Sequence, residues 1–270
     1  MLKTIREAKV GKATVRLVQT QKGYSGVVFL DGKRQALEEG ENADDVWRRI
    51  HDAAVRLNPR FVGYDGARTR FLYFFPQGFE GADYSGHERA YKLKAKSKLD
   101  EAAPLPEAAK GHGFGEAVLS AYRATNLLSP FEKTRLAPML RGPDADAFIQ
   151  AAASVANGDI KGGLAAMKSV LKPHDNAKWT VVTYLPFLWK PEEHVFLKPT
   201  MITAFAERVG HPFADAYKPE LDPAVYESLL DLTRTTKEKI ADLGPRDMID
   251  VQSFMWTAVE YTEDDKVDYE

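Results

Sequence analysis

The segment 84–98 has the residue composition of a surface that binds nucleic acid. It carries five cations within ten residues, and two tyrosines accompany them. Because cations neutralise phosphates and aromatic rings stack on bases, this composition favours nucleic-acid binding. We predict phosphate contacts from Arg89, Lys92, Lys94, Lys96 and Lys98, and stacking by Tyr84 and Tyr91. The four lysines alternate along the chain instead of following helical spacing, so a solvated helix is the alternative interpretation.

A second group of residues has the chemistry of acid–base or metal-assisted catalysis. Asp247 and Asp250 lie three apart at the start of a predicted helix, so they share one face. With Lys198 and Arg246 they form the candidate catalytic set of a metal-dependent hydrolase or nuclease with a site between two modules. The structural alternative is that Asp247 caps the helix and Asp250 pairs with Arg246. The residues after Asp250 lack the lysine of a nuclease motif, which counts against an endonuclease.

The remaining motifs do not predict a metal or cofactor site. A glycine-rich run from Gly111 to Gly115 precedes a predicted helix, where backbone N–H groups can hold a phosphate. A proline-containing connector stands before it instead of a strand, so we interpret the run as a flexible helix entry. The histidines show no H-x-H or H-E-x-x-H spacing. We therefore predict no metal and no cofactor.

An aromatic cluster between residues 61 and 79 supports a third hypothesis, a protein–protein adaptor. Arginine and aromatic residues dominate the hot spots of protein interfaces. The cluster consists of Arg68, Arg70, Phe71, Tyr73, Phe75 and Phe79. Strand alternation would bury at least one face of it, and most of these rings would then belong to the core.

The composition is that of a folded protein and is compatible with a reducing compartment. Hydrophobic residues make up 44% and charged residues 28% of the 270 residues. The absence of cysteine excludes disulfides, thiolate nucleophiles and zinc–cysteine sites. No stretch approaches the roughly 20 apolar residues of a membrane span, and the N-terminus has no apolar run, so we expect a soluble, cytoplasmic protein without a membrane partner.

The N-terminal part predicts strands and one helix. Strands are expected at 14–20 and 23–30, with Asp31 and Gly32 as the turn that ends the second. A helix should begin near Asn42 and end before Pro59. Two more strands are expected at 61–64 and 70–75, which gives a ββαββ order.

The rest of the chain predicts helices. A basic helix is expected at 87–99, and a connector follows at 102–106. Helix starts are indicated by a capping box at Ser129, by Asp222 with Pro223, and by Pro245. Other helices are expected at 114–126, 144–156, 159–171 and 199–209. The segment 179–188 stays open between a strand and a buried helix.

These elements predict the α+β fold class. We expect a small N-terminal antiparallel sheet with one covering helix, followed by a mainly α-helical C-terminal module. The predicted boundaries are 1–100 for the β-containing module, 101–262 for the helical module and 263–270 for an acidic tail.

Two stretches within residues 179–256 resemble segments of uncharacterised bacterial proteins. The first is W-T-V-V-T-Y-L-P-F-L from Trp179 together with F-L-K-P from Phe196, and the second is L-G-P-R-D-M-I-D-V-Q-S-F-M-W from Leu243. They are also similar to helical regions that accompany McrB-type methyl-directed restriction systems. The resemblance implies an accessory or recognition role in bacterial defence. It transfers no catalytic residue, because the chain has neither an ATPase motif nor a nuclease motif.

The leading hypothesis from the sequence is a non-catalytic module that recognises nucleic acid through the basic segment. The metal-dependent hydrolase or nuclease and the adaptor for a protein partner stay open as alternatives.

Overall fold

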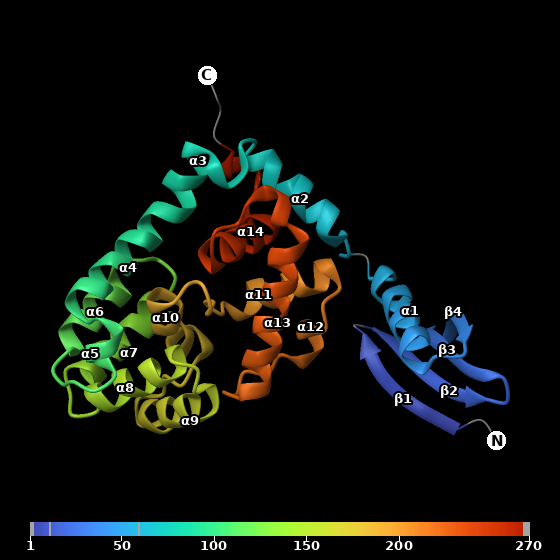
Figure 1. The fold of residues 1–270 in the computed structure, drawn as a ribbon, viewed down its shortest axis with the longest axis horizontal. Coiled ribbons are helices and arrows are strands. Elements are labelled where there is room, and N and C mark those ends of the chain that lie inside the picture. Colours follow the sequence, from blue (N-terminus) through green and yellow to red (C-terminus); the bar gives the residue numbers. More distant parts are fainter. Residues whose placement is uncertain (1–2, 11, 59, 267–270) are drawn as a thin grey trace. The chain divides into compact units, whose positions relative to one another are not determined.

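The chain folds into a four-stranded sheet followed by helices (Figure 1). The computed structural model describes residues 3–10, 12–58 and 60–266. An N-terminal antiparallel sheet with a largely helical remainder confirms the predicted α+β class. Among the described residues, no helix is long and apolar enough to cross a membrane.

The sheet is an antiparallel meander in the order β1-β2-β3-β4. Its strands are β1 (Lys3–Val10), β2 (Ala13–Thr20), β3 (Gly23–Leu30) and β4 (Lys33–Gly40). The predicted strands at 14–20 and 23–30 are confirmed as β2 and β3. The outer strands β1 and β4 were not predicted. Asp31 and Gly32 both have positive φ, at 50° and 74°, which is the geometry of a tight hairpin turn into β4.

One face of the sheet packs against α1 (Ala43–Arg56), as predicted (Figure 1). The Asn42 side chain caps this helix and accepts hydrogen bonds from the backbone N–H groups of Asp44 and Asp45. Val15 pairs with Val28 across the sheet, and both pack with Ile50 of the helix. The inward-facing residues of the strands and the apolar face of the helix therefore form one small core.

The predicted strands at 61–64 and 70–75 are wrong, because this region forms the helix α2 (Gly63–Phe74). The buried residues Ala67, Phe71 and Phe74 of this helix, and Phe75 directly after it, follow positions i, i+4, i+7 and i+8. This is the spacing of one face of a helix. The observed order at the N-terminus is therefore ββββα, not ββαββ.

The other predicted helices are present, with boundaries close to the expected ones. The open segment 179–188 is a helix with all of its residues buried, which agrees with its lack of a polar face. The main helices are α4 (Ala90–Ala102), α6 (Gly115–Arg123), α7 (Pro130–Leu140), α8 (Ala145–Ala156), α9 (Ile160–Leu171), α10 (Trp179–Trp189), α11 (Pro199–Val209), α13 (Pro223–Lys239) and α14 (Met248–Glu260). Short helices are α3 (Ala82–Tyr84), α5 (Leu105–Ala108) and α12 (Phe213–Ala216).

The chain divides into two compact units at positions other than the predicted boundary at residue 100. The first unit comprises Met1–Ala67 and Thr203–Tyr217, and the second comprises Arg68–Ile202 and Lys218–Glu270. The connector at 102–106 lies inside the second unit. There Ala103 is buried, and its carbonyl accepts a hydrogen bond from Trp189 Nε1 at 3.0 Å.

Part of the predicted acidic tail is folded. The short helix Glu263–Asp265 is capped by Thr262, and Glu263 accepts a hydrogen bond from Tyr73 Oη at 2.6 Å. Residues 263–265 of the predicted acidic tail therefore form an ordered short helix, while residues 267–270 lie outside the described part of the chain.

Candidate functional site

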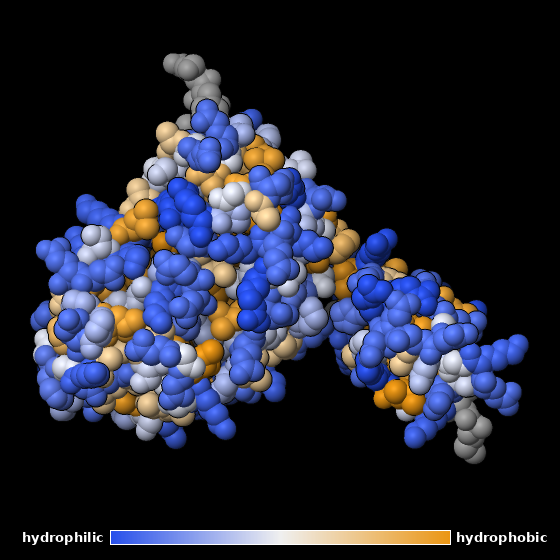
Figure 2. All heavy atoms as spheres, in the orientation of Figure 1, coloured by the Kyte–Doolittle hydropathy of each residue, from blue (hydrophilic) through white to orange (hydrophobic). Residues whose placement is uncertain are grey.

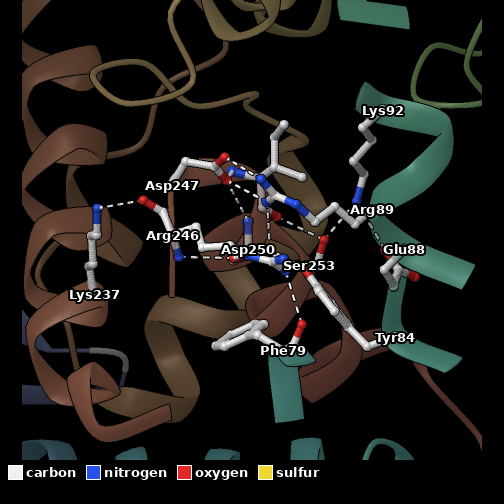
Figure 3. A network of polar contacts seen from close by, with 11 residues as sticks. Phe79, Tyr84, Glu88, Arg89, Lys92, Lys237, Arg246, Asp247, Asp250 and Ser253 are labelled. Carbon is white, nitrogen blue, oxygen red and sulfur yellow. Dashed lines mark hydrogen bonds and ion pairs between the residues drawn. The ribbon is translucent and has the colours of Figure 1, made fainter. Parts of the chain in front are cut away.

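The densest group of buried charged residues lies between α14 and the segment that leads into α4 (Figure 3). This segment runs from α3 through a π-helical turn (Ser85–Arg89) into α4. The turn buries the adjacent residues Glu88 and Arg89 together. Single π-helical turns occur frequently at functional sites. The turn therefore directs two opposite charges into the protein.

Arg89 joins the turn to the start of α14 through two carboxylates. Its guanidinium donates to both oxygens of Asp247, at 2.8 and 2.7 Å, and to Oδ1 of Asp250 at 2.7 Å. Asp247 is also the N-cap of α14, and its Oδ1 accepts from the backbone N–H of Ile249 at 3.0 Å. Burial acts to lower the pKa of Arg89, but the ion pairs outweigh it and raise that pKa above its usual value.

Asp250 is fully buried, and each of its carboxylate oxygens accepts hydrogen bonds. Tyr84 Oη donates to Oδ1 at 2.6 Å, and Arg246 donates to Oδ2 from Nε at 2.8 Å and from its backbone N–H at 2.9 Å. Burial acts to raise the pKa of Asp250, but these hydrogen bonds and Arg89 hold it below its usual value. Burial, followed by the neighbouring Asp250 charge, raises the pKa of Tyr84. Tyr84 is therefore a neutral donor to a permanent carboxylate.

A second buried ion pair lies one helical turn further along α4. Lys92 Nζ donates to Glu88 Oε2 at 2.9 Å and to Ser253 Oγ of α14 at 2.8 Å. The other oxygen of Glu88 accepts from Tyr261 Oη at 2.9 Å. Burial lowers the pKa of Lys92, although Glu88 opposes this effect. Both ends of the pair are satisfied within the protein.

A cavity of about 100 Å³ lies beside this second ion pair. Gln252 of α14 lines it, is only 1% exposed, and has no hydrogen-bond partner for its Oε1 among the described residues. Lys198 also lines the cavity, with its Nζ 4.0 Å from the ring centre of Trp256. Burial lowers the pKa of Lys198. The cavity is lined by His87, Glu88, Tyr91, Lys92, Asn126, Leu127, Lys198, Gln252 and Trp256.

The structure corrects the predicted phosphate-binding set. Arg89 and Lys92 are buried in ion pairs, and Tyr84 is buried against Asp250, so none of the three can face a nucleic acid. Lys96 pairs with Asp100 at 2.9 Å and also donates to the Trp189 carbonyl. Lys94 and Lys98 are exposed, and Tyr91 is half-buried. The basic segment therefore has one set of side chains buried in the protein and another set exposed to solvent.

The predicted catalytic residues do not converge on a common cavity. Arg246, Asp247 and Asp250 lie together, but every carboxylate oxygen of the two aspartates already accepts from a protein donor. Lys198 lines the cavity, which none of the other three residues lines. The arrangement matches the structural alternative, a helix cap at Asp247 with an Asp250–Arg246 pair at 2.8 Å. It leaves no carboxylate free to bind a metal or to activate water.

The aromatic cluster of the adaptor hypothesis is mostly interior. Phe71, Phe75 and Phe79 are buried around Tyr84. Tyr73 is exposed, and Arg68 forms an ion pair with Asp242. On the face shown in Figure 2, hydrophobic residues lie scattered among hydrophilic ones.

The other motifs take structural roles. In the glycine-rich run, the Gly113 N–H donates to Asp146 Oδ1 at 2.8 Å, which holds the entry to α6. Within the described part of the chain, no group of three or more histidines and carboxylates could hold a metal ion.

Sequence reasoning missed the residues that complete the network and the cavity. These are Glu88, Asn126, Gln252, Ser253, Trp256 and Tyr261. Two sequence signals were available: Glu88 and Lys92 stand four apart, as do Gln252 and Trp256. Residues at this spacing share a helix face.

No family model, no curated protein and no solved structure matches the chain. The resemblance of 179–256 to restriction-associated segments stays a prediction.

Proposed function

We propose that the chain is a non-catalytic module that binds single-stranded nucleic acid along one flank of α4. The observation that carries this proposal is the position of Tyr91, Lys94 and Lys98. They stand three and four residues apart, so they form a line along the helix, and its Tyr91 end lines the cavity with Lys198.

The cations on this flank are free to meet phosphates. Lys94 and Lys98 are exposed, and neither has a carboxylate partner within the described residues. Lys198 has none there either, and its ammonium packs on Trp256. Unpaired lysines bind phosphate at a lower cost than paired ones, because no existing ion pair has to break.

The aromatic residues favour a single strand over a duplex. Tyr91 is half-buried on the flank and Trp256 lines the adjoining cavity. In single strands the bases are accessible, and stacking on an aromatic ring contributes about 1–3 kcal/mol per base. In a duplex, stacking and pairing hide the same faces.

The test is fluorescence anisotropy with labelled single-stranded and duplex DNA and RNA, in salt from about 50 to 200 mM. With Lys94 and Lys98 binding phosphate, log K should fall against log salt with a slope of about −1.4 for a single strand. The double variant Lys94→Glu/Lys98→Glu should lose at least tenfold in affinity.

A matched control distinguishes the effect of the α4 flank on affinity from the effect of the change in net charge. Lys161 and Lys168 are exposed on α9 of the same unit, and Lys161→Glu/Lys168→Glu changes the net charge by the same amount. We expect this control to bind nearly as well as the unchanged protein. Equal losses in both double variants, or no binding at the lowest salt, would contradict the proposal.

A further inference from the structure

The Gln252 side chain, beside the cavity, has an unmet hydrogen-bonding capacity. It lines the cavity and is 1% exposed, and its Oε1 has no partner among the described residues. A buried acceptor without a donor destabilises the protein, because it has lost its hydrogen bonds to water without gaining others. A group that brings an N–H or O–H donor into the cavity removes this penalty.

An amide side chain specifies more than one hydrogen bond. Its oxygen accepts and its adjacent –NH₂ donates in the same plane. The complement is a ligand edge with a donor directly beside an acceptor. A lactam edge, N–H next to C=O, has this arrangement, and it is the edge of uracil, thymine and guanine.

Lys198 selects for an acceptor on the same ligand. Its ammonium lies 4.0 Å from the Trp256 ring centre and has no carboxylate partner in the described chain. An ammonium only donates, so it favours a carbonyl oxygen on the ligand. The neighbouring Glu88 and Lys92 do not compete for the ligand, because they bind each other, Ser253 and Tyr261.

The size and the walls of the cavity fit a flat ring and not a whole nucleotide. Its volume is about 100 Å³, whereas sites for drug-sized ligands span roughly 300–1,000 Å³. Tyr91 and Trp256 supply aromatic wall surface. A sugar and its phosphates would remain outside, and Tyr91 is also where the flank that carries Lys94 and Lys98 begins.

We propose that this cavity binds the lactam edge of a nucleobase, with Gln252 reading the N–H and Lys198 the carbonyl oxygen. This inference rests on the proposed function in one respect, since it treats the base as part of the strand held along α4. It adds a base preference, for uracil, thymine or guanine over cytosine and adenine.

The experiment uses free nucleosides, which carry no phosphate for Lys94 or Lys98. Binding of uridine, 3-methyluridine and cytidine to the full chain is measured by ligand-detected NMR and titration calorimetry. 3-Methyluridine lacks the N–H donor, and cytidine has an acceptor at that position. We expect uridine to bind at least about tenfold more tightly than either.

The decisive variant is Gln252→Met, which keeps the length of the side chain and removes its hydrogen bonds. It should lose uridine binding while its thermal midpoint holds or rises, because an unsatisfied buried amide is removed. The control Gln77→Met changes an exposed glutamine and should bind uridine as the unchanged chain does.

The outcomes separate this inference from the proposed function. Salt-dependent strand binding with equal affinity for the three nucleosides, or with no uridine binding, overturns the base preference and leaves the strand proposal standing. If uridine does not bind, the cavity holds water only. Uridine binding that disappears in Gln252→Met and persists in Lys94→Glu/Lys98→Glu supports the inference independently of the phosphate contacts.

Discussion

His194 is a buried histidine whose ring nitrogens are both engaged. Nε2 faces the Ala156 carbonyl at 3.3 Å and must donate to it, so Nδ1 accepts from Tyr226 Oη at 3.0 Å. Burial lowers the pKa of His194 below its usual 6.5. As the pH falls, the unfolded chain takes up this proton first. The stabilisation is therefore complete above pH 6.5 and is lost as the pH falls through the folded-state pKa.

We expect the free energy of unfolding, measured with urea at a series of pH values, to decrease below pH 6.5. In His194→Gln this decrease should become shallower. His112→Gln changes a mostly exposed histidine and serves as the control. An unchanged pH dependence in His194→Gln would show that other groups cause it.

Asp250 gives a second prediction at the scale of the residue. Its fully buried carboxylate balances Arg89, which is buried, and Arg246, whose side chain is half-exposed, and accepts from the buried Tyr84. Removing one partner of a buried ion pair costs about 3–5 kcal/mol, because the remaining charge is left uncompensated. We expect a loss of this size for Asp250→Asn in chemical denaturation. Glu101→Gln, at an exposed position of α4, should change stability by less than about 0.5 kcal/mol. A loss as small for Asp250→Asn would show that the network contributes little.

The sequence identified the charged residues of this network better than their roles. Arg89, Lys92, Asp247 and Asp250 were each singled out, but as surface or catalytic groups. The reason is physical: a sequence does not show which helix faces another, and a π-helical turn has no sequence signature. That turn places Glu88 and Arg89 inside together. The Asp247 cap was predictable, because it depends only on neighbouring residues.

At the scale of the elements, the sequence predicted the features that depend on interactions between neighbouring residues. The capping box at Ser129 is present, with its side chain accepting from the Glu132 N–H at 3.3 Å. The misassigned helix α2 is rich in aromatic residues, which favour strands by intrinsic propensity. Burial of Ala67, Phe71 and Phe74 on one face overrides that propensity. Strand β4 contains helix-favouring residues and forms because it pairs with β3 across the turn.

The turn between β3 and β4 can be tested with two matched glycines. Gly32 has φ +74°, Gly86 does not have a left-handed φ, and an added Cβ would meet no atom within 4 Å at either position. Neither substitution causes a steric clash, so the two differ in the backbone strain that an alanine meets at the left-handed φ of position 32. We expect Gly32→Ala to destabilise the protein by about 1 kcal/mol, and Gly86→Ala to be neutral or slightly stabilising. Equal effects in thermal denaturation would show that the turn does not determine β4.

At the scale of the whole molecule, the division of the chain was harder to predict than its elements. A proline-containing connector usually marks a boundary, but here it lies inside the second unit and is held there by the buried Ala103. The first unit takes in Thr203–Tyr217, which lies far along the sequence. Such a discontinuous unit depends on long-range contacts, and composition along the chain does not report them.

Two units with separate cores should unfold in distinguishable steps. Ile50 is fully buried in the first unit and Leu185 in the second. Truncating either residue to alanine should cost about 2–5 kcal/mol in its own unit. In calorimetry we expect more than one transition, with Ile50→Ala lowering one midpoint and Leu185→Ala lowering another. The proposed strand-binding flank of α4 and the proposed nucleobase cavity both belong to the second unit, so Ile50→Ala should bind oligonucleotides and uridine as the unchanged chain does. If both variants shift a single common transition by the same amount, the units are energetically one, and a mutation in the first unit would weaken binding at the proposed site as well.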